Sequence, residues 1–249
     1  MTPPPPEPPV LPEAVLFTFD NAWDSVYTHA YPTLEAQGFK GTVYATSGTI
    51  DSHEPYITLA QYQEMYADGW DVGNHCSVHV YLADKTEAEQ EAYLENCALY
   101  LEANGMPRAA RHVAYPNGSW DEDTFTAMAA TGMLTGRTFA RSGMTEQLTP
   151  IVNPYEIKGV YNLYNNSNVR TVEAAQQILT TGSPGRIVTF LVHTLEPAGA
   201  ESGDPGYEDG TGWTPEAFAE LVAYVKGLGV PVVTISQLYA YIQAGYVWP

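Results

Sequence analysis

Basic residues are scarce in this sequence of 249 residues. It has 10 lysines and arginines against 29 aspartates and glutamates, which gives a formal net charge of -19 at pH 7. Such a surface repels phosphate backbones and anionic lipids, so we expect no nucleic acid and no membrane among the partners. The sequence also lacks an apolar run of about 18 residues, which is the length that a membrane-spanning helix needs.

Cysteine is nearly absent as well. Cys76 and Cys97 are the only two in the chain. They could form one disulfide or remain as two buried thiols, and their spacing does not decide between these states.

The composition otherwise predicts one large folded domain, since 45% of the residues are hydrophobic. Residues 1–13 are rich in proline and are predicted to form a stiff linker. Residues 14–249 form the predicted domain. We expect other domains to be joined through the linker in a longer chain, and we expect the protein to be secreted or at the cell surface.

Strand and helix patterns alternate along this domain. The predicted strands are 15–19, 41–46, 70–74, 111–115, 134–140, 155–163, 186–193 and 230–235. The predicted helices are 25–37, 59–67, 86–103, 123–131, 171–181, 215–227 and 237–244, with Ser236 capping the last. Repeated β-α units form parallel sheets with right-handed crossovers. The sequence therefore predicts an α/β fold, a distorted (β/α) barrel of about seven parallel strands in a single domain.

Polar side chains follow several of these strands where each one ends. The apolar run 15–19 leads directly into Asp20 and Asn21. Side chains at the carboxyl ends of parallel strands line the functional site in such folds. Asp20 is therefore a candidate site residue, although an aspartate at this point could instead only cap the following helix.

Three further strand ends carry similar groups, namely the pair His75 and His79, the segment 115–118 and His193. Two histidines four residues apart can bind one metal ion, although this spacing alone is a weak signal. Asp20 and His193 would add a base and an acid, namely a carboxylate that is ordinarily ionised at neutral pH and an imidazole whose ordinary pKa lies close to it. Together these residues predict metal-assisted hydrolysis.

The same segments resemble the ordered motifs of the polysaccharide deacetylases, the NodB-type domain of carbohydrate esterase family four. Residues 18–21 (TFDN) are similar to the family's TFDD, 75–79 (HCSVH) to H-[ST]-x-x-H, 115–118 (YPNG) to its third motif and 191–193 (LVH) to L-x-H. Residues 38–44 (GFKGTVY) resemble the family's second strand. The resemblance extends over residues 15–244 and implies deacetylation of an acetylated polysaccharide.

The resemblance implies a role for each matching residue. Asp20 is the implied general base and His193 the implied general acid. His75 and His79 are the implied ligands of a divalent metal, most often zinc and sometimes cobalt or nickel. Leu191 is expected to form part of the pocket for the acetyl methyl group. The backbone N–H of Asn117 is expected to stabilise the oxyanion, and Tyr115 of the same segment is a further candidate for substrate contact.

The sequence departs from the family pattern at two positions. Asn21 replaces the aspartate that serves as third metal ligand, so metal affinity should fall, and Asp24 is the nearest alternative carboxylate. Ala114 replaces the arginine that pairs with the base. Arg137 or Arg141 could supply the missing guanidinium, and Arg111 is a weaker candidate.

The family's fourth motif has no clear counterpart. Trp120 and Trp213 are candidates for stacking on sugars, or for core packing. The leading hypothesis is a hydrolase acting on an N-acetylglucosamine polymer, such as chitin or peptidoglycan, or on O-acetylated xylan. One alternative is a degenerate member that binds glycans with little or no hydrolysis, and another is a structural α/β module that binds metal.

Overall fold

The structure is a computed structural model that describes residues 12–21, 23–52, 56–139, 146–159, 161–163, 169–196 and 213–245. Two predictions lie wholly or mainly outside these residues. They concern the Pro-rich linker, of which only residues 12 and 13 are described, and Arg141.

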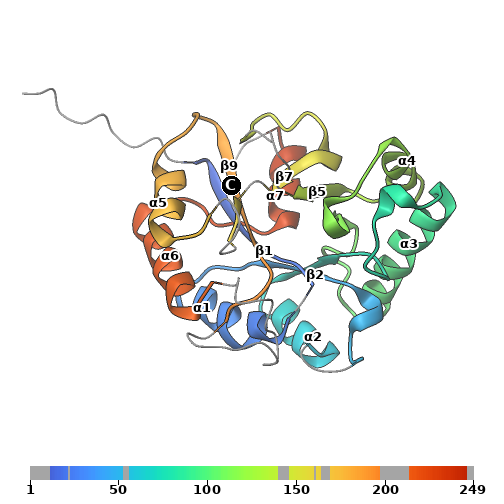
Figure 1. Cartoon of the computed structure of the whole chain (residues 1–249), viewed down its shortest axis with the longest axis horizontal. Helices are drawn as coiled ribbons and strands as arrows, with labels where there is room; N and C mark the ends of the chain where they lie inside the picture. Colours follow the sequence, from blue (N-terminus) through green and yellow to red (C-terminus); the bar gives the residue numbers. More distant parts are fainter. Residues whose placement is uncertain are drawn as a thin grey trace, which may run out of the picture.

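One sheet runs through the whole domain (Figure 1), in the order β6-β9-β1-β2-β3-β4-β5-β7, with β8 also paired to β9. The strands are β1 (Ala14–Phe19), β2 (Thr42–Ala45), β3 (Asp71–Asn74), β4 (His112–Ala114), β5 (Thr135–Phe139), β6 (Gln147–Leu148), β7 (Ile157–Gly159), β8 (Tyr161–Asn162) and β9 (Arg186–Val192). Every pairing is parallel except that of β6 with β9.

The sheet nearly closes on itself through β7 and β8. β7 pairs with β5, whereas β8, which begins two residues later, pairs with β9 on the other side. This one segment therefore links the two margins of the sheet. The predicted strand 155–163 corresponds to β7 and β8 among the described residues. The predicted distorted barrel of about seven parallel strands in one domain is confirmed.

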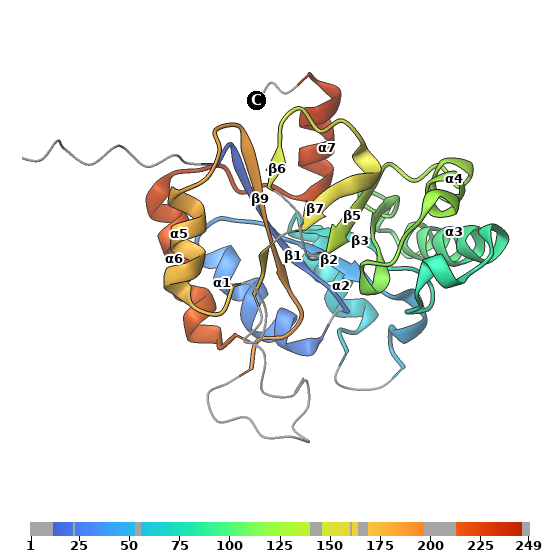
Figure 2. The ribbon, with the colours of Figure 1, turned by 45° about the horizontal axis from the view of Figure 1, so that its top comes forward.

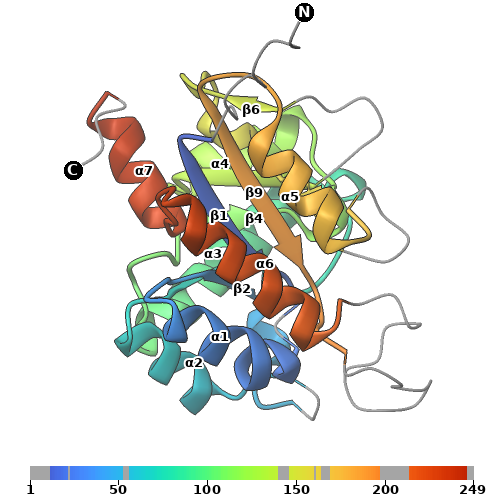
Figure 3. The ribbon, with the colours of Figure 1, turned by 90° about the vertical axis from the view of Figure 1, so that its left-hand side faces the viewer.

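Helices cover the outside of the sheet. They are α1 (Tyr31–Ala36, preceded by a π-helical turn at Val26–Ala30), α2 (Leu59–Ala67), α3 (Glu87–Ala103), α4 (Glu122–Ala130), α5 (Val172–Thr180), α6 (Pro215–Leu228) and α7 (Ile235–Gln243). Figure 3 shows α5 and α6 lying alongside β9 and β1. Capping boxes at Thr58, Thr86 and Asp121 begin α2, α3 and α4, and in each the cap side chain accepts from the backbone N–H three residues later. Among the described residues, no helix is both long and apolar enough to cross a bilayer.

The core between β1 and its helices is aromatic. Phe17 of β1 stacks on Phe190 of β9, with ring centroids 5.6 Å apart, and meets Phe218 of α6 edge to face, also at 5.6 Å. All three side chains are fully buried. Burial of such rings contributes about 2–3 kcal/mol each, which holds β1 firmly in the middle of the sheet.

The predicted strand 230–235 is wrong. Only Val232 makes a bridge, to Val15, because Pro231 interrupts the run and cannot donate to a ladder. The segment leads instead into α7, whose N-cap is Thr234 rather than Ser236. The Ile235 N–H donates to Thr42 Oγ1 (3.0 Å), at the first residue of β2. The start of α7 thus lies over the amino ends of the strands (Figure 2), and the carboxyl ends remain available for a site.

Candidate active site

Asp20 lies immediately after β1, as its position in the sequence predicts. Its N–H donates to the Val192 carbonyl (3.0 Å), so the end of β1 stays fixed to the end of β9. Asn21 follows in the left-handed region, with φ of 64°. Asparagine tolerates this conformation better than most residues. The chain therefore turns sharply at the site, and the Asp20 side chain is only 6% exposed.

Arg137 of β5 forms an ion pair with Asp20. Its Nη2 donates to both carboxylate oxygens, one of them at 2.5 Å. The guanidinium is buried and lies 5.2 Å from the centre of the Tyr44 ring. Burial by itself would raise the pKa of Asp20, but the Arg137 charge, with help from His75 and His193, lowers it below the ordinary value. The carboxylate is consequently ionised at neutral pH.

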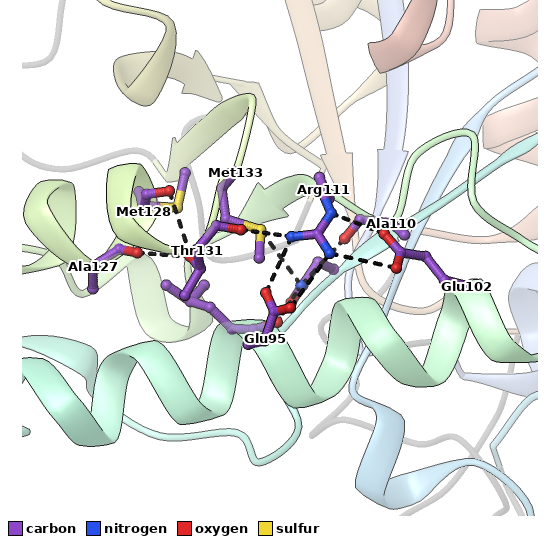
Figure 4. Close-up of polar contacts among 10 residues, drawn as sticks. Glu95, Glu102, Ala110, Arg111, Ala127, Met128, Thr131 and Met133 are labelled. Atoms are coloured by element: carbon purple, nitrogen blue, oxygen red, sulfur yellow. Dashed lines mark hydrogen bonds and ion pairs between the residues drawn. The ribbon is translucent and has the colours of Figure 1, made fainter.

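Two further arginines were candidates for this position. Arg141 lies outside the described residues. Arg111 points to the outside of the barrel, where it pairs with Glu102 (2.8 Å) and Glu95 (3.1 Å) of α3 (Figure 4). Of the two candidates that the structure describes, Arg137 is the one that contacts Asp20.

His75 and His79 face each other, with ring centroids 5.1 Å apart. His75 follows β3, and its Nδ1 lies 2.7 Å from the Ala114 carbonyl oxygen. That carbonyl can only accept, so Nδ1 carries the proton and Nε2 keeps its lone pair. Burial lowers the pKa of His75 to about 4 and also lowers that of His79. Both rings are therefore neutral at pH 7, which is the form that binds metals.

A small pocket of about 100 Å³ brings these groups together. Its lining residues are Asp20, Asn21, His75, His79, Tyr115, Asn117, Gly118, Phe139 and His193. They come from the carboxyl ends of β1, β3, β4, β5 and β9. All four strand ends that the sequence analysis singled out thus contribute to one cavity.

The turn after β4 builds the wall of the pocket next to His75. Asn117 has a φ of 56°, and the Gly118 N–H donates to the Tyr115 carbonyl (2.9 Å), so the turn is tight. The Tyr115 hydroxyl donates to the Tyr155 carbonyl (2.9 Å), which keeps its ring in the wall. Gly136 makes room for this tyrosine, because a Cβ there would lie 1.9 Å from the hydroxyl oxygen.

Several other residues lie elsewhere. Leu191 is fully buried within β9 and does not line the pocket. Asp24 lies on the first helical turn, where Oδ1 accepts from Gln61 Nε2 (3.4 Å). Trp213 is buried and donates to the Val169 carbonyl (3.1 Å), and Trp120 stacks on Phe125 at 4.8 Å. Both tryptophans therefore serve in packing. Phe139, which does line the pocket, was not predicted; the only signal was its place at the end of a strand.

The donor set fits a divalent metal in part. His75 and His79 supply two neutral imidazoles, and the Ala114 carbonyl orients the first of them as second-layer partners of metal-binding histidines do. Asn21 can add only a neutral amide oxygen. Among the residues that the structure describes, no group of three or more His, Cys, Asp or Glu side chains is arranged to hold a metal. Cys76 and Cys97 are buried free thiols.

Comparison with known proteins agrees with this arrangement. The family described as polysaccharide deacetylase matches residues 8–136. A Bacillus subtilis (strain 168) protein named "Putative polysaccharide deacetylase YxkH" is 29% identical over 126 residues. That match covers 51% of this chain and 44% of YxkH, so the chain spans less than half the length of this relative.

Solved structures share the fold. A mutant of the peptidoglycan deacetylase PdaC from Bacillus subtilis has a TM-score of 0.61 at 14% identity, over 94% of this chain and 92% of that one. The Xyl-CE4 domain of a multidomain xylanase from the hindgut metagenome of Trinervitermes trinervoides gives 0.59 at 15% identity, over 94% and 91%. BA3943, a CE4 family pseudoenzyme from Bacillus anthracis, gives 0.59 at 16% identity, over 91% and 65%. The family match extends from the linker through β1, β3 and β4 to β5, and so includes Asp20, both histidines of the pair and the turn at Asn117. The chain belongs to the polysaccharide deacetylase family.

Proposed function

We propose that this domain is a metal-dependent hydrolase that removes acetyl groups from a polysaccharide. The observation that carries the proposal is that Asp20, His75, His79 and His193 line one pocket. A carboxylate held ionised, two neutral imidazoles and a further histidine are the groups that metal-assisted hydrolysis of an acetyl amide or ester needs. The pocket of about 100 Å³ is also of a size for an acetyl group rather than a whole sugar.

His75 and His79 would hold the divalent metal, with zinc the first choice and cobalt or nickel as alternatives, and Asn21 would be a weak third ligand. When bound, the ion supplies Lewis-acid polarisation of the acetyl carbonyl and of water. Two imidazoles and an amide oxygen carry no charge, so we expect weaker binding than at a site with a carboxylate ligand.

The chain's own residues then move the protons. Asp20 accepts the proton of the attacking water, because Arg137 keeps the carboxylate ionised and fixes its orientation. The backbone N–H of Asn117 donates to the oxygen that gains charge as water adds to the carbonyl. His193, on the same pocket, donates a proton to the departing sugar nitrogen or oxygen. Phe139 and Tyr115 form part of the pocket wall around these groups.

The substrate that we propose is an N-acetylglucosamine polymer or O-acetylated xylan. The names of similar folds support both classes, since one is a peptidoglycan deacetylase and another a domain of a multidomain xylanase. Further domains attached through the Pro-rich segment would bring the domain to such a polymer.

A second candidate function follows from Asn21. A neutral residue at the third ligand position favours a glycan-binding protein with little or no hydrolysis, and one similar fold is titled a pseudoenzyme. Asp20, Arg137 and His193 argue for catalysis, because a binding protein has no use for a buried charged pair beside a histidine.

The experiment that separates the two is acetate release measured together with metal content. The parent protein, loaded with zinc, is given acetylated chitooligosaccharides and acetylxylan, and Asp20→Asn is compared with Asp24→Asn, a matched change outside the pocket. We expect acetate from the parent and from Asp24→Asn, and a loss of at least about 100-fold in Asp20→Asn. Acetate release at the parent rate from Asp20→Asn would refute the proposed chemistry, and no release from the parent would favour the glycan-binding function.

A further inference from the structure

A second hollow of about 170 Å³ adjoins the pocket. It is lined by Asn21, Trp23, Thr46, Thr49, Tyr56 and His79. Asn21 and His79 line the pocket as well, so the two spaces meet at these residues. Each is smaller than the roughly 300–1,000 Å³ of usual small-molecule sites, which suits one unit of a longer ligand in each space.

An aromatic pair forms one side of this hollow. The Trp23 and Tyr56 rings stack, with centroids 5.1 Å apart and planes inclined by 28°. Trp23 follows β1, and Tyr56 precedes α2, so they come from separate segments. Both side chains are only partly buried, although large aromatic rings usually gain most from complete burial. A broad apolar surface of this kind fits the C–H face of a pyranose ring.

The pair is held in place before any ligand arrives. The backbones of Trp23 and Tyr56 form an antiparallel bridge. Beyond Tyr56, the Thr58 capping box fixes the start of α2, and the Leu59 N–H donates to Asp51 Oδ1 (2.9 Å). A surface whose geometry is already fixed loses little entropy on binding.

Two threonine hydroxyls contribute to the rest of the lining. Thr49 Oγ1 donates to the Thr46 carbonyl (2.9 Å), and Thr46 Oγ1 donates to the His75 carbonyl (3.2 Å). Each hydroxyl proton is thus used within the protein, which leaves the oxygen lone pairs to accept from a ligand hydroxyl. Apart from His79, which belongs to the pocket as well, none of the lining side chains carries a formal charge at neutral pH. This combination suits a neutral polyhydroxylated ligand better than an ion or a charged peptide.

We propose that the Trp23–Tyr56 hollow is a subsite for a neutral sugar unit next to the acetylated unit in the pocket. The inference rests on the proposed function, because that function supplies the polymer. One sugar presents its acetyl group to the pocket, and its neighbour in the chain stacks on the aromatic pair. The subsite then gives the domain a preference for oligomers over single sugars.

The test compares chain lengths. We would measure kcat/KM for the zinc-loaded protein on N-acetylglucosamine and on its tetramer, and on acetylated xylose and xylotetraose. In Trp23→Ala the advantage of the preferred tetramer over its monosaccharide should fall by about 3- to 10-fold, mainly through KM, as expected for one aromatic contact. Trp23→Phe should recover most of it. Tyr27→Ala is the matched control, because Tyr27 belongs to another stacked pair, with Tyr31, that does not line the hollow.

Binding measured without turnover separates the two proposals. Isothermal titration of both tetramers into the Asp20→Asn protein reports on the subsite even when no variant releases acetate. Trp23→Ala or Tyr56→Ala is then added to the Asp20→Asn protein, and circular dichroism shows whether each double variant is folded like the parent. Weaker binding in folded double variants supports the subsite, even if the catalytic proposal is wrong. Parent-like affinity in both variants, or a parent-like chain-length preference, would overturn it. If Trp23→Ala does not fold, Tyr56→Ala and Trp23→Phe decide by the same measurements.

Discussion

Arg137 Nη2 donates to both carboxylate oxygens of Asp20, although the two residues are 117 positions apart in the sequence. β1 carries the carboxylate and β5 the guanidinium, and three strands lie between them in the sheet order. The contact is therefore made across the barrel interior, not along the sheet. It leaves the carboxylate charged despite almost complete burial, since a buried charge needs a partner.

Removing this guanidinium should impair catalysis more than it impairs binding. Without Arg137, burial raises the pKa of Asp20 and the carboxylate also loses its orientation. We expect Arg137→Gln to lower kcat by about 10- to 100-fold and to move the acidic limb of the pH–rate profile to higher pH. Arg137→Lys, which keeps the charge, should restore part of the rate. An unchanged acidic limb in Arg137→Gln would show that Arg137 does not tune the base.

Asn21 should limit the affinity for metal. Replacing it with aspartate adds a charged oxygen beside the two histidines, and we expect zinc to bind about 10- to 100-fold more tightly. Competition with a chelator measures this directly. Asn104→Asp, far from the site in the turn after α3, is the control for added charge. An unchanged zinc affinity in Asn21→Asp would place position 21 outside the ligand set.

His112 should make the domain less stable in acid. It is 1% exposed, its Nδ1 lies 2.9 Å from Thr135 Oγ1, and burial lowers its pKa to about 4. The unfolded chain binds a proton near pH 6.5, whereas the folded protein resists it until about pH 4. Stability contributed by the neutral ring is therefore complete above pH 6.5 and is lost as the pH falls toward 4, by up to roughly 3 kcal/mol.

Urea unfolding of the metal-free protein at pH 7 and at pH 4.5 measures this effect. His112→Gln should show a smaller difference between the two pH values than the parent, whatever its absolute stability. The remaining difference should include His75, whose lowered pKa acts in the same direction. If the difference in unfolding free energy between the two pH values were the same in His112→Gln as in the parent, His112 would not be kept neutral in the fold.

Asp71 should matter for stability and not for activity. It lies at the first residue of β3, fully buried, where Oδ1 accepts from Arg108 Nε (2.8 Å) and Oδ2 from the Ser236 N–H (2.8 Å). Asp71→Ala removes the charged hydrogen bonds that join β3 to Arg108 and to the start of α7, so the free energy of unfolding should fall by about 2–4 kcal/mol. Glu220→Ala, an exposed change on α6, should leave it within about 0.5 kcal/mol. A large fall in kcat/KM of Asp71→Ala, measured at a temperature where the variant is still folded, would contradict the idea that the amino ends of the strands serve stability alone.

The sequence by itself determined which strand ends carry the site. Asp20, the histidine pair, the turn at Asn117 and His193 could be predicted because each follows an apolar strand, and parallel strands bring their carboxyl ends to one edge. The barrel could be predicted because hydrophobic periodicity is a local property of the sequence, and it shows strands and helices in alternation. The strand 230–235 was wrongly predicted because the β-branched residues outweighed Pro231, which has no N–H to donate, and the segment forms only a single bridge, between Val232 and Val15.

Only the tertiary structure decided which distant side chains meet. Arg137, Arg141 and Arg111 were equally basic in the sequence, but the register of β5 against β4 and β7 directs Arg137 inward to Asp20. The stacking of Trp23 on Tyr56 depends on how the segment after β1 pairs with the one before α2. Such contacts depend on strand register and on the curvature of the closed sheet, and the local sequence around each residue determines neither of these.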